Sequence, residues 1–160
     1  MEVKALLQVM PQQGKVEWIG LRSKKKGAIQ VQDQASIDLV EGLVGDHYQG
    51  KSAKRQVTLI QAEHLAVVAA IIKKEKIAPE LTRRNIVVSG INLFALKDQQ
   101  FSIGNEIILE TTGICHPCSR MEENLGTGGY NAMRGHGGIT CRVIRGGNFR
   151  LGDTVQLKAK

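Results

Sequence analysis

The segment "FSIGNEIIL" at residues 101–109 is repeated in similar form as "FRLGDTVQL" at residues 149–157. In both, an aromatic, a polar and an aliphatic residue precede a glycine that is followed by Asn or Asp, and a strand-like stretch comes next. Gly104 and Gly152, with the residues that follow them, are typical of two-residue hairpin turns, because they tolerate the backbone angles that such turns need. The repetition therefore predicts one β-hairpin unit that is used twice.

Seven segments of the sequence are predicted to be strands, because they contain β-branched residues and end at glycine or polar residues. One clear helix is predicted at residues 61–76, because acidic residues come early and lysines late, and Pro79 follows. Many short strands avoid exposed edges most simply by closing into a barrel. We expect a mostly β fold, a closed or nearly closed β-barrel with a few short helices, in a single domain over residues 1–160. The predicted strands are residues 15–20, 28–32, 56–60, 85–90, 106–113, 139–144 and 154–158.

The composition, with 42% hydrophobic and 23% charged residues, is that of a globular protein rather than a disordered or membrane protein. The longest apolar run, "LAVVAAII" at residues 65–72, is far shorter than the roughly 20 residues that cross a membrane. The first residues, "MEVKALLQVMPQQG", do not have the pattern of a secretory signal. We therefore expect a cytoplasmic protein that does not bind membranes.

The net charge of +7 is partly concentrated in the runs "RSKKKG" at residues 22–27 and "KKEK" at residues 73–76. Such runs are usually solvated loops and helix ends, but they can also bind phosphates of nucleic acid. Aromatic residues make up only 4% of the chain, so stacking platforms for single strands are not expected. We therefore do not expect a nucleic-acid partner, whereas a phosphorylated small molecule would suit the positive charge.

Residues 112–143, "TGICHPCSRMEENLGTGGYNAMRGHGGITCRV", contain all three cysteines. An odd number of cysteines in a reducing compartment favours metal, cofactor or redox chemistry over structural disulfides. A first hypothesis is zinc, because the spacing C-x2-C-x17-H-x4-C could complete a tetrahedral site. Against zinc, the last cysteine lies in the strand-like "ITCRVI", where a buried cysteine is more often part of the core. The four candidate zinc ligands are Cys115, Cys118, His136 and Cys141.

A second hypothesis is disulfide exchange at "CHPC", residues 115–118, since a C-x-x-C motif can activate a thiol. The context argues against it, because a thioredoxin-like motif follows an early strand of a βαβ unit. This motif instead lies late in a β-rich chain, and no proline follows it that could pack against the thiols.

A third hypothesis is a single thiolate that ligates a soft metal. Ser119 and Glu122 have capping-box spacing, which predicts a short helix that begins directly after Cys118. The helix dipole and Arg120 would favour the thiolate form of Cys118.

The glycine-rich stretch at residues 126–138 would give this thiolate an anion-binding neighbour. Glycines allow close backbone approach to a ligand, and Arg and His side chains can bind phosphate oxygens. We prefer the combination of a metal-ligating cysteine and an anion-binding loop, with a mobile surface loop as the alternative. The polar residues of this stretch are Asn131, Arg134 and His136.

At this point the sequence resembles the MOSC domain family, named for the C-terminal part of molybdenum cofactor sulfurases. Each matching piece is short, but the pieces occur in order through most of the chain, with a cysteine after the Gly-Asn turn and its strand. The pieces are "GLVGDHYQG" (42–50), "KRQVTLIQAEHL" (54–65), "TRRNIVVSGINL" (82–93), "FSIGNEIILETTGICHPCSRMEENLG" (101–126) and "GGITCRVIRGGNFRLGDTVQL" (137–157).

The resemblance implies a β-rich barrel and an essential cysteine that carries sulfur or coordinates the molybdenum of a pterin cofactor. This cysteine corresponds to Cys118, with Cys115 as an additional thiol. The cofactor-holding "R-x-N" segment of the family corresponds to Arg83 and Asn85, with Arg84 between them. A looser correspondence, for which turn capping or surface ion pairing is the alternative, includes Asp46, His47, Arg55 and Gln56.

The family also implies two activities. Some relatives reduce N-hydroxylated compounds with electrons from partner proteins, and others transfer sulfur to the cofactor. We expect a short stand-alone member that binds the molybdenum-pterin cofactor and reduces an N-hydroxylated small molecule, with Cys118 as the metal ligand and a separate electron-donor protein. The alternatives are a sulfur carrier that holds a persulfide on Cys118 and is loaded by a sulfur donor, or a binding module that delivers the cofactor.

Overall fold

The computed structural model describes residues 1–24, 27–47 and 53–159. Seven of the described strands form a closed barrel in the order β11-β7-β8-β9-β5-β6-β1, and the barrel closes because β1 also pairs with β11. Neighbouring barrel strands are antiparallel except β5 and β6, which run parallel. The barrel strands are β1 (Gly14–Leu21), β5 (Val57–Gln61), β6 (Ile86–Ser89), β7 (Gln100–Ile103), β8 (Ile107–Ile114), β9 (Ile139–Arg145) and β11 (Thr154–Leu157).

The remaining described strands lie outside the ring. One short strand extends the edge of β1, and three others form a separate small sheet in the order β10-β3-β4. These strands are β2 (Gln30–Gln32), β3 (Gln34–Asp38), β4 (Gly42–Leu43) and β10 (Gly147–Arg150).

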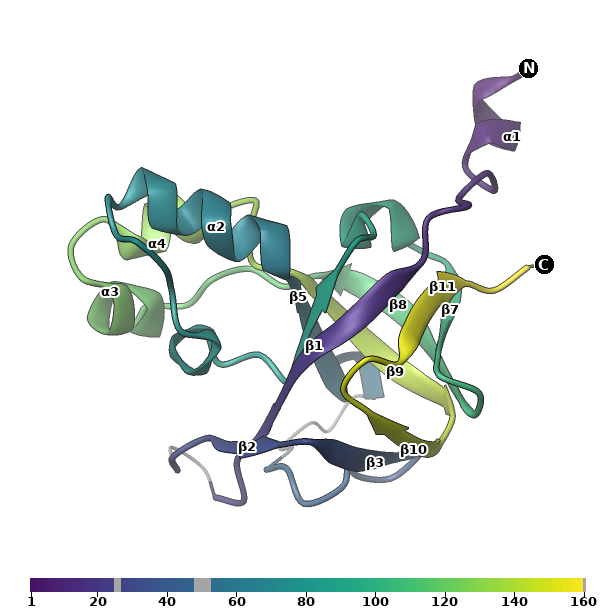
Figure 1. Ribbon diagram of the computed structural model, residues 1–160, viewed down its shortest axis with the longest axis horizontal. Helices are drawn as coiled ribbons and strands as arrows, with labels where there is room; N and C mark the ends of the chain where they lie inside the picture. The colour runs from purple at the N-terminus through teal and green to yellow at the C-terminus, as the bar shows by residue number, and fades with distance from the viewer. Residues whose placement is uncertain (25–26, 48–52, 160) are drawn as a thin grey trace.

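The longest described helix, α2, connects β5 to β6, as a crossover must when two paired strands run parallel. Figure 1 shows α2, α3 and α4 together on one side of the barrel, whereas α1 and β11 lie on the other side. None of the helices in the described residues is long and apolar enough to cross a membrane. The helices are α1 (Val3–Leu6), α2 (Ala62–Ile71), α3 (Arg120–Leu125) and α4 (Gly129–Met133), with 3-10 turns η1 (Ala53–Arg55), η2 (Pro79–Thr82) and η3 (Leu93–Leu96).

Two clusters of buried apolar side chains hold these layers together. The larger cluster fills the barrel and includes Phe101 and Leu109, and the smaller one lies under the helices and includes Met121. Successive side chains of a strand point to opposite faces, so β5 contributes Leu59 to the barrel and Ile60 to the helical layer. β5 is therefore buried on both faces. This burial holds the strand in place and so fixes the position of its first residues.

The mostly β barrel with short helices that the sequence predicts is confirmed. The prediction of two equivalent two-residue hairpins is wrong. β7 and β8 form a hairpin, but Ile103 pairs with Ile107, so three residues connect them. The second copy is not a hairpin, because β10 pairs with β3 whereas β11 pairs with β7 and β1. Gly152, with φ of +88°, instead turns the chain from one sheet into the other.

The predicted helix at residues 61–76 is shorter than expected. α2 ends before Lys73, whose left-handed φ of +60° stops the helix. The late lysines therefore follow the helix, and the Lys74 ammonium donates a hydrogen bond to the carbonyl oxygen of Leu125. All seven predicted strands match observed ones to within two residues at each end, and the largest difference is at residues 28–32, where the strand begins only at Gln30.

Candidate functional site

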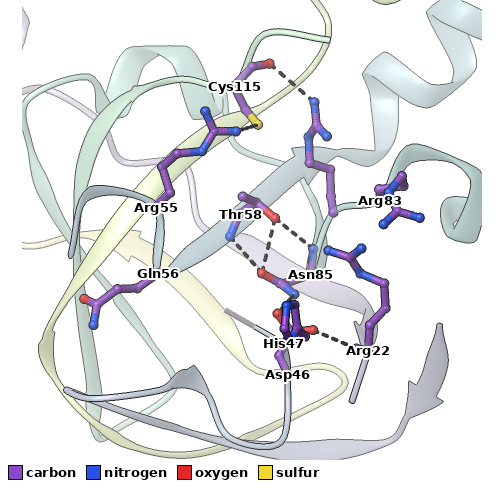
Figure 2. A pocket seen from close by; sticks show the side chains of 10 residues that line it. Arg22, Asp46, His47, Arg55, Gln56, Thr58, Arg83, Asn85 and Cys115 are labelled. Atoms are coloured by element: carbon purple, nitrogen blue, oxygen red, sulfur yellow. Dashed lines mark hydrogen bonds between the residues drawn. The ribbon is translucent and has the colours of Figure 1, made fainter. Parts of the chain in front are cut away.

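A concave cavity of about 370 Å³ lies at one end of the barrel, where β1 and β8 end and where β5 and β6 begin. Figure 2 shows side chains from these separate elements arranged around it. The barrel thus collects residues that are far apart in sequence, including most of those that the family resemblance assigned to cofactor binding. The lining residues are Arg22, Asp46, His47, Arg55, Gln56, Thr58, Arg83, Arg84, Asn85 and Cys115.

Asn85 is the centre of a hydrogen-bond network that fixes one wall of the cavity (Figure 2). Its side-chain oxygen accepts hydrogen bonds from the backbone N–H and the hydroxyl of Thr58, at 3.1 and 3.2 Å. Its side-chain nitrogen donates to Asp46 at 3.2 Å, and Asp46 in turn accepts from the backbone N–H of Arg22 at 2.7 Å. The predicted residues Asp46 and Asn85 therefore meet in this wall, where protein groups satisfy both side chains.

Gln56 has a similar structural role. Its side chain donates to the carbonyl oxygen of Leu39 and accepts from the backbone N–H of Val143, both at 2.8 Å. The buried amide therefore joins the segment before β4 to β9 at the rim of the cavity.

Arg84 joins the cavity to the cysteine-containing loop. Its guanidinium is buried, and it donates hydrogen bonds to the carbonyl oxygens of Thr82 at 2.9 Å and of Gly137 at 2.8 Å. Longer bonds of 3.5 Å reach the carbonyl oxygens of Cys115 and His116. One side chain thus positions both the start of the C-x-x-C loop and the end of the glycine-rich segment.

The charge of this guanidinium extends to both thiols of the motif. Burial is the main cause that lowers the pKa of Arg84, whereas the thiols of Cys115 and Cys118 raise this pKa and Arg55 lowers it further. Cys118 therefore lies within electrostatic range of Arg84, although it does not line the cavity.

The cavity is strongly cationic and can offer hydrogen-bond donors to a ligand. In the part of the chain that the structure describes, no ion pair involves any of its four arginines. Arg55 approaches the sulfur of Cys115 at 3.8 Å instead of a surface carboxylate, and Arg83 takes a left-handed φ of +60°. Among the described residues, the buried Nε2 of His47 has no hydrogen-bond partner. These residues fit an anionic ligand that accepts several hydrogen bonds, such as the phosphate group of a pterin cofactor.

Cys118 faces a second, more open depression of about 590 Å³. It is exposed, and it comes two residues before α3, as the sequence predicts. The predicted capping box is wrong, because the Ser119 side chain caps nothing and Glu122 does not bond back to it. The Glu122 carboxylate reaches forward instead and accepts backbone N–H bonds from Gly128 and Tyr130.

The glycine-rich segment does not form one loop over the cationic cavity, because part of it folds into α4. Asn131 lines the depression beside Cys118. Arg134 donates to the Asn131 side chain at 3.3 Å, and His136 packs edge-on against His64 at 5.3 Å between ring centroids. Neither Arg134 nor His136 lines either of the two cavities, so the structure does not bring them to the predicted cofactor site.

The zinc hypothesis is wrong. Within the described residues, which include all four candidates, no three His, Cys, Asp or Glu side chains are placed to hold a metal ion. Cys141 is fully buried in the barrel core, where burial raises the pKa of its thiol far above the usual value. The redox hypothesis also lacks its structural context, because the motif follows β8 of a barrel and all three cysteines are free.

Sequence reasoning missed Arg22 and Thr58 as cavity residues. Arg22 begins a basic run that we interpreted mainly as solvated charge, and nothing in that run separates its first residue from the lysines that follow. Two of those lysines, Lys25 and Lys26, and residues 48–50 of the family-like piece "GLVGDHYQG" lie outside the described residues.

Together, these features define a closed mixed β-barrel with a cationic cavity and a cysteine-containing loop at one end. A family profile for the MOSC domain matches residues 45–156, and the chain therefore belongs to the MOSC domain family. A search of curated proteins gave no match.

Solved structures share the fold. The YuaD protein from Bacillus subtilis is 20% identical, with a TM-score of 0.80 over 93% of this chain and 98% of that one. YiiM from Escherichia coli is 16% identical, with a TM-score of 0.68 over 91% and 70% of the two chains. YiiM from Geobacillus stearothermophilus is 12% identical, with a TM-score of 0.70 over 91% and 75%.

Proposed function

We propose that this protein binds a molybdenum-pterin cofactor in the cationic cavity, with Cys118 as the thiolate ligand of the metal, and reduces N-hydroxylated small molecules. The MOSC domain family is associated with this cofactor. The observation that carries the proposal is the convergence of four arginines on one cavity without an ion pair among the described residues. Unpaired cations in a concave, hydrogen-bonded site favour a phosphate-bearing ligand.

The chain's own residues divide the work of binding. Arg22, Arg55 and Arg83 would donate charge-assisted hydrogen bonds to the anionic end of the cofactor, and His47 would use its buried Nε2. Asn85 does not need to touch the ligand, because its bonds to Thr58 and Asp46 hold the wall in place.

Arg84 would position the thiol ligand through the backbone of the C-x-x-C loop. Cys118 is the exposed thiol of that loop, so it can reach a metal and a solvent-borne substrate, whereas the Cys115 thiol is buried against Arg55. The bound cofactor would supply the oxygen-atom transfer chemistry, with electrons from a separate donor protein. The protein would contribute ligation and orientation.

Metal analysis tests the assignment directly. The protein and its Cys118→Ser and Cys115→Ser variants would be expressed in a host that makes the pterin cofactor, and molybdenum would be measured by mass spectrometry. We expect about one molybdenum per chain in the wild type and in Cys115→Ser, and background levels in Cys118→Ser. Loss of molybdenum in Cys115→Ser alone would transfer the ligand role to Cys115, and a wild type without molybdenum would refute the proposal.

Turnover is the second test. Loaded wild-type protein with a chemical reductant should convert an N-hydroxylated base to the parent base, and Cys118→Ser should not. A loaded protein that retains molybdenum but turns over no N-hydroxylated compound would favour the cofactor-delivery module instead.

The exposure of Cys118 also supports a second candidate, a sulfur carrier, because a carrier thiol must be accessible to both donor and acceptor proteins. After incubation with a cysteine desulfurase and cysteine, intact mass spectrometry should then show the mass of one added sulfur atom on Cys118. The carrier role would be excluded if the protein never acquired this added sulfur atom and still had full reductase activity.

A further inference from the structure

The helix α2 is apolar on its outer face as well as on its buried face. One face packs into the smaller apolar cluster, and Figure 1 shows the helix along the upper edge of the molecule. On the outer face, Val67 is 39% exposed and Ile71 is 53% exposed. A helix that is apolar all round is normally covered on every side, so this face is a candidate contact surface. The exposed apolar residues of the outer face are Ala66, Val67, Ala70 and Ile71.

The two ends of the outer face carry opposite charges. Glu63, in the first turn, is exposed and is the only carboxylate of α2, and the helix contains no Lys or Arg. The exposed segment 73–76 directly after the helix has three lysines and one glutamate, which is a net charge of +2. The face is therefore apolar in the middle, negative at its start and positive at its end. Such a face is complementary to a second copy of itself that runs in the opposite direction, and antiparallel helix dipoles also attract each other.

We propose that the outer face of α2 is a homodimer interface, in which the α2 helices of two copies pack antiparallel across a two-fold axis. Contacts across such an axis are reciprocal, because each copy contributes the same patch. One register places Ala66 opposite the partner's Ile71 and Val67 opposite the partner's Ala70. Each larger side chain then meets an alanine, which allows the helix axes to approach to about 8 Å.

The same register places Glu63 opposite the partner's Lys74 at both ends of the interface. The Glu63 Oε2 accepts a hydrogen bond from the backbone N–H of Gly90 at 2.9 Å, and the Lys74 ammonium donates one to the carbonyl oxygen of Leu125 at 3.3 Å. A carboxylate has about four acceptor positions and an ammonium has three donors. Both groups can therefore form the ion pair between copies without breaking the bonds within each copy.

Sedimentation equilibrium of the full-length protein without cofactor tests the proposal independently of any metal or activity. A single helix face is smaller than the roughly 800 Å² that each partner buries in a standard interface. We therefore expect a weak dimer with a dissociation constant on the order of 100 μM, measured over a range of about 10 μM to 1 mM.

The first variant places a charge in the apolar centre of the interface. Ala70→Glu changes an exposed position that needs no repacking within one copy, and it should raise the dissociation constant at least about tenfold. Ala5→Glu is the matched control, because it makes the same change at an exposed alanine of α1, on the other side of the barrel. The control should stay within about twofold of the wild type.

A second pair of variants tests the antiparallel direction. Glu63→Lys and Lys74→Glu should each weaken their own homodimer about fivefold, because like charges then face each other at both ends. An equal mixture of the two variants should recover the affinity of the wild type, because opposite charges face each other again at both ends of the mixed dimer.

A wild type that remains monomeric at about 1 mM would overturn the proposal and would leave this face to a different protein. Equal weakening by Ala70→Glu and Ala5→Glu would also overturn it, since the cause would then be net charge. A dimer that Ala70→Glu leaves intact would place the interface elsewhere. A mixture of Glu63→Lys and Lys74→Glu that associates no more tightly than either variant alone would refute the antiparallel arrangement.

Discussion

Cys115 and Cys118 are three residues apart in one loop, yet they belong to different surroundings. Cys115 is buried, lies against Arg55 and lines a cationic cavity whose walls are fixed by barrel strands. Cys118 is exposed in a depression that is built from α3 and α4 and contains the Glu122 carboxylate. The barrel end supplies a rigid scaffold, and the helical layer supplies accessible chemical groups. Substitutions of the wall residues in the first region should therefore affect stability, those of its arginines cofactor binding, and those in the second region mainly activity.

The largest expected effect is at the junction between the two regions. Gly138 has a φ of +86°, and a Cβ there would collide with the carbonyl oxygen of Leu59. Gly138→Ala should lower the free energy of unfolding by about 3 kcal/mol, from left-handed strain plus overpacking. Gly128→Ala is the matched control, because its φ is +89° but its Cβ would meet nothing within 4 Å, and it should cost only about 1 kcal/mol. Urea unfolding measures both, and equal losses would show that the barrel contact does not matter.

The next effect separates the cavity wall from the surface. Asn85→Ala removes the partner of Thr58 and of Asp46 and should lower the free energy of unfolding by about 2 kcal/mol. Asn148→Ala removes one hydrogen bond, which the exposed Asn148 side chain accepts from the Ser36 hydroxyl, and should change the free energy of unfolding by less than about 0.5 kcal/mol. Chemical denaturation of the two variants would contradict the network argument if Asn148→Ala were the more damaging change.

The smallest effect concerns pH. Burial lowers the pKa of His64 below the usual 6.5, His136 lowers it further and Glu63 opposes this. The unfolded chain therefore binds the proton more readily than the folded one. The stability contribution of neutral His64 is complete above pH 6.5 and is lost as the pH falls through the lower folded-state pKa.

We expect a loss of less than about 1 kcal/mol on acidification, because His64 is only partly buried. His64→Gln should flatten the dependence of the urea midpoint on pH, whereas the same change at the exposed His116 should not. An unchanged profile in His64→Gln would assign the acid sensitivity to other groups.

Much of the barrel could be predicted because its strands have strong local signals. "QVTLI" at residues 56–60 is apolar because β5 is buried on both faces, and "EIILETTG" at residues 106–113 follows a glycine turn. β3 and β10 could not be predicted in this way, since they pair with each other across more than 100 residues and carry mostly polar or partly exposed side chains. Long-range pairing, rather than local propensity, makes them strands.

The candidate site shows the same limit. The family resemblance located Arg83, Arg84 and Asn85, because they stand in one short motif. Arg22 joins them only because β1 pairs with β6 and ends beside it, which is a property of the barrel and not of the basic run. The capping-box pattern also failed for a tertiary reason, since α4 offers Glu122 backbone donors that the pattern does not contain.

The pairing that closes the barrel also constrains how the chain can be made. β11 is the last of the described strands along the sequence, and it fills the gap between β7 and β1. A nascent chain on a ribosome therefore has to keep two open strand edges until the segment Thr154–Leu157 emerges. During that interval the incomplete barrel is most exposed to strand pairing with another chain, so slow translation of the segment that contains β11 would favour aggregation over folding.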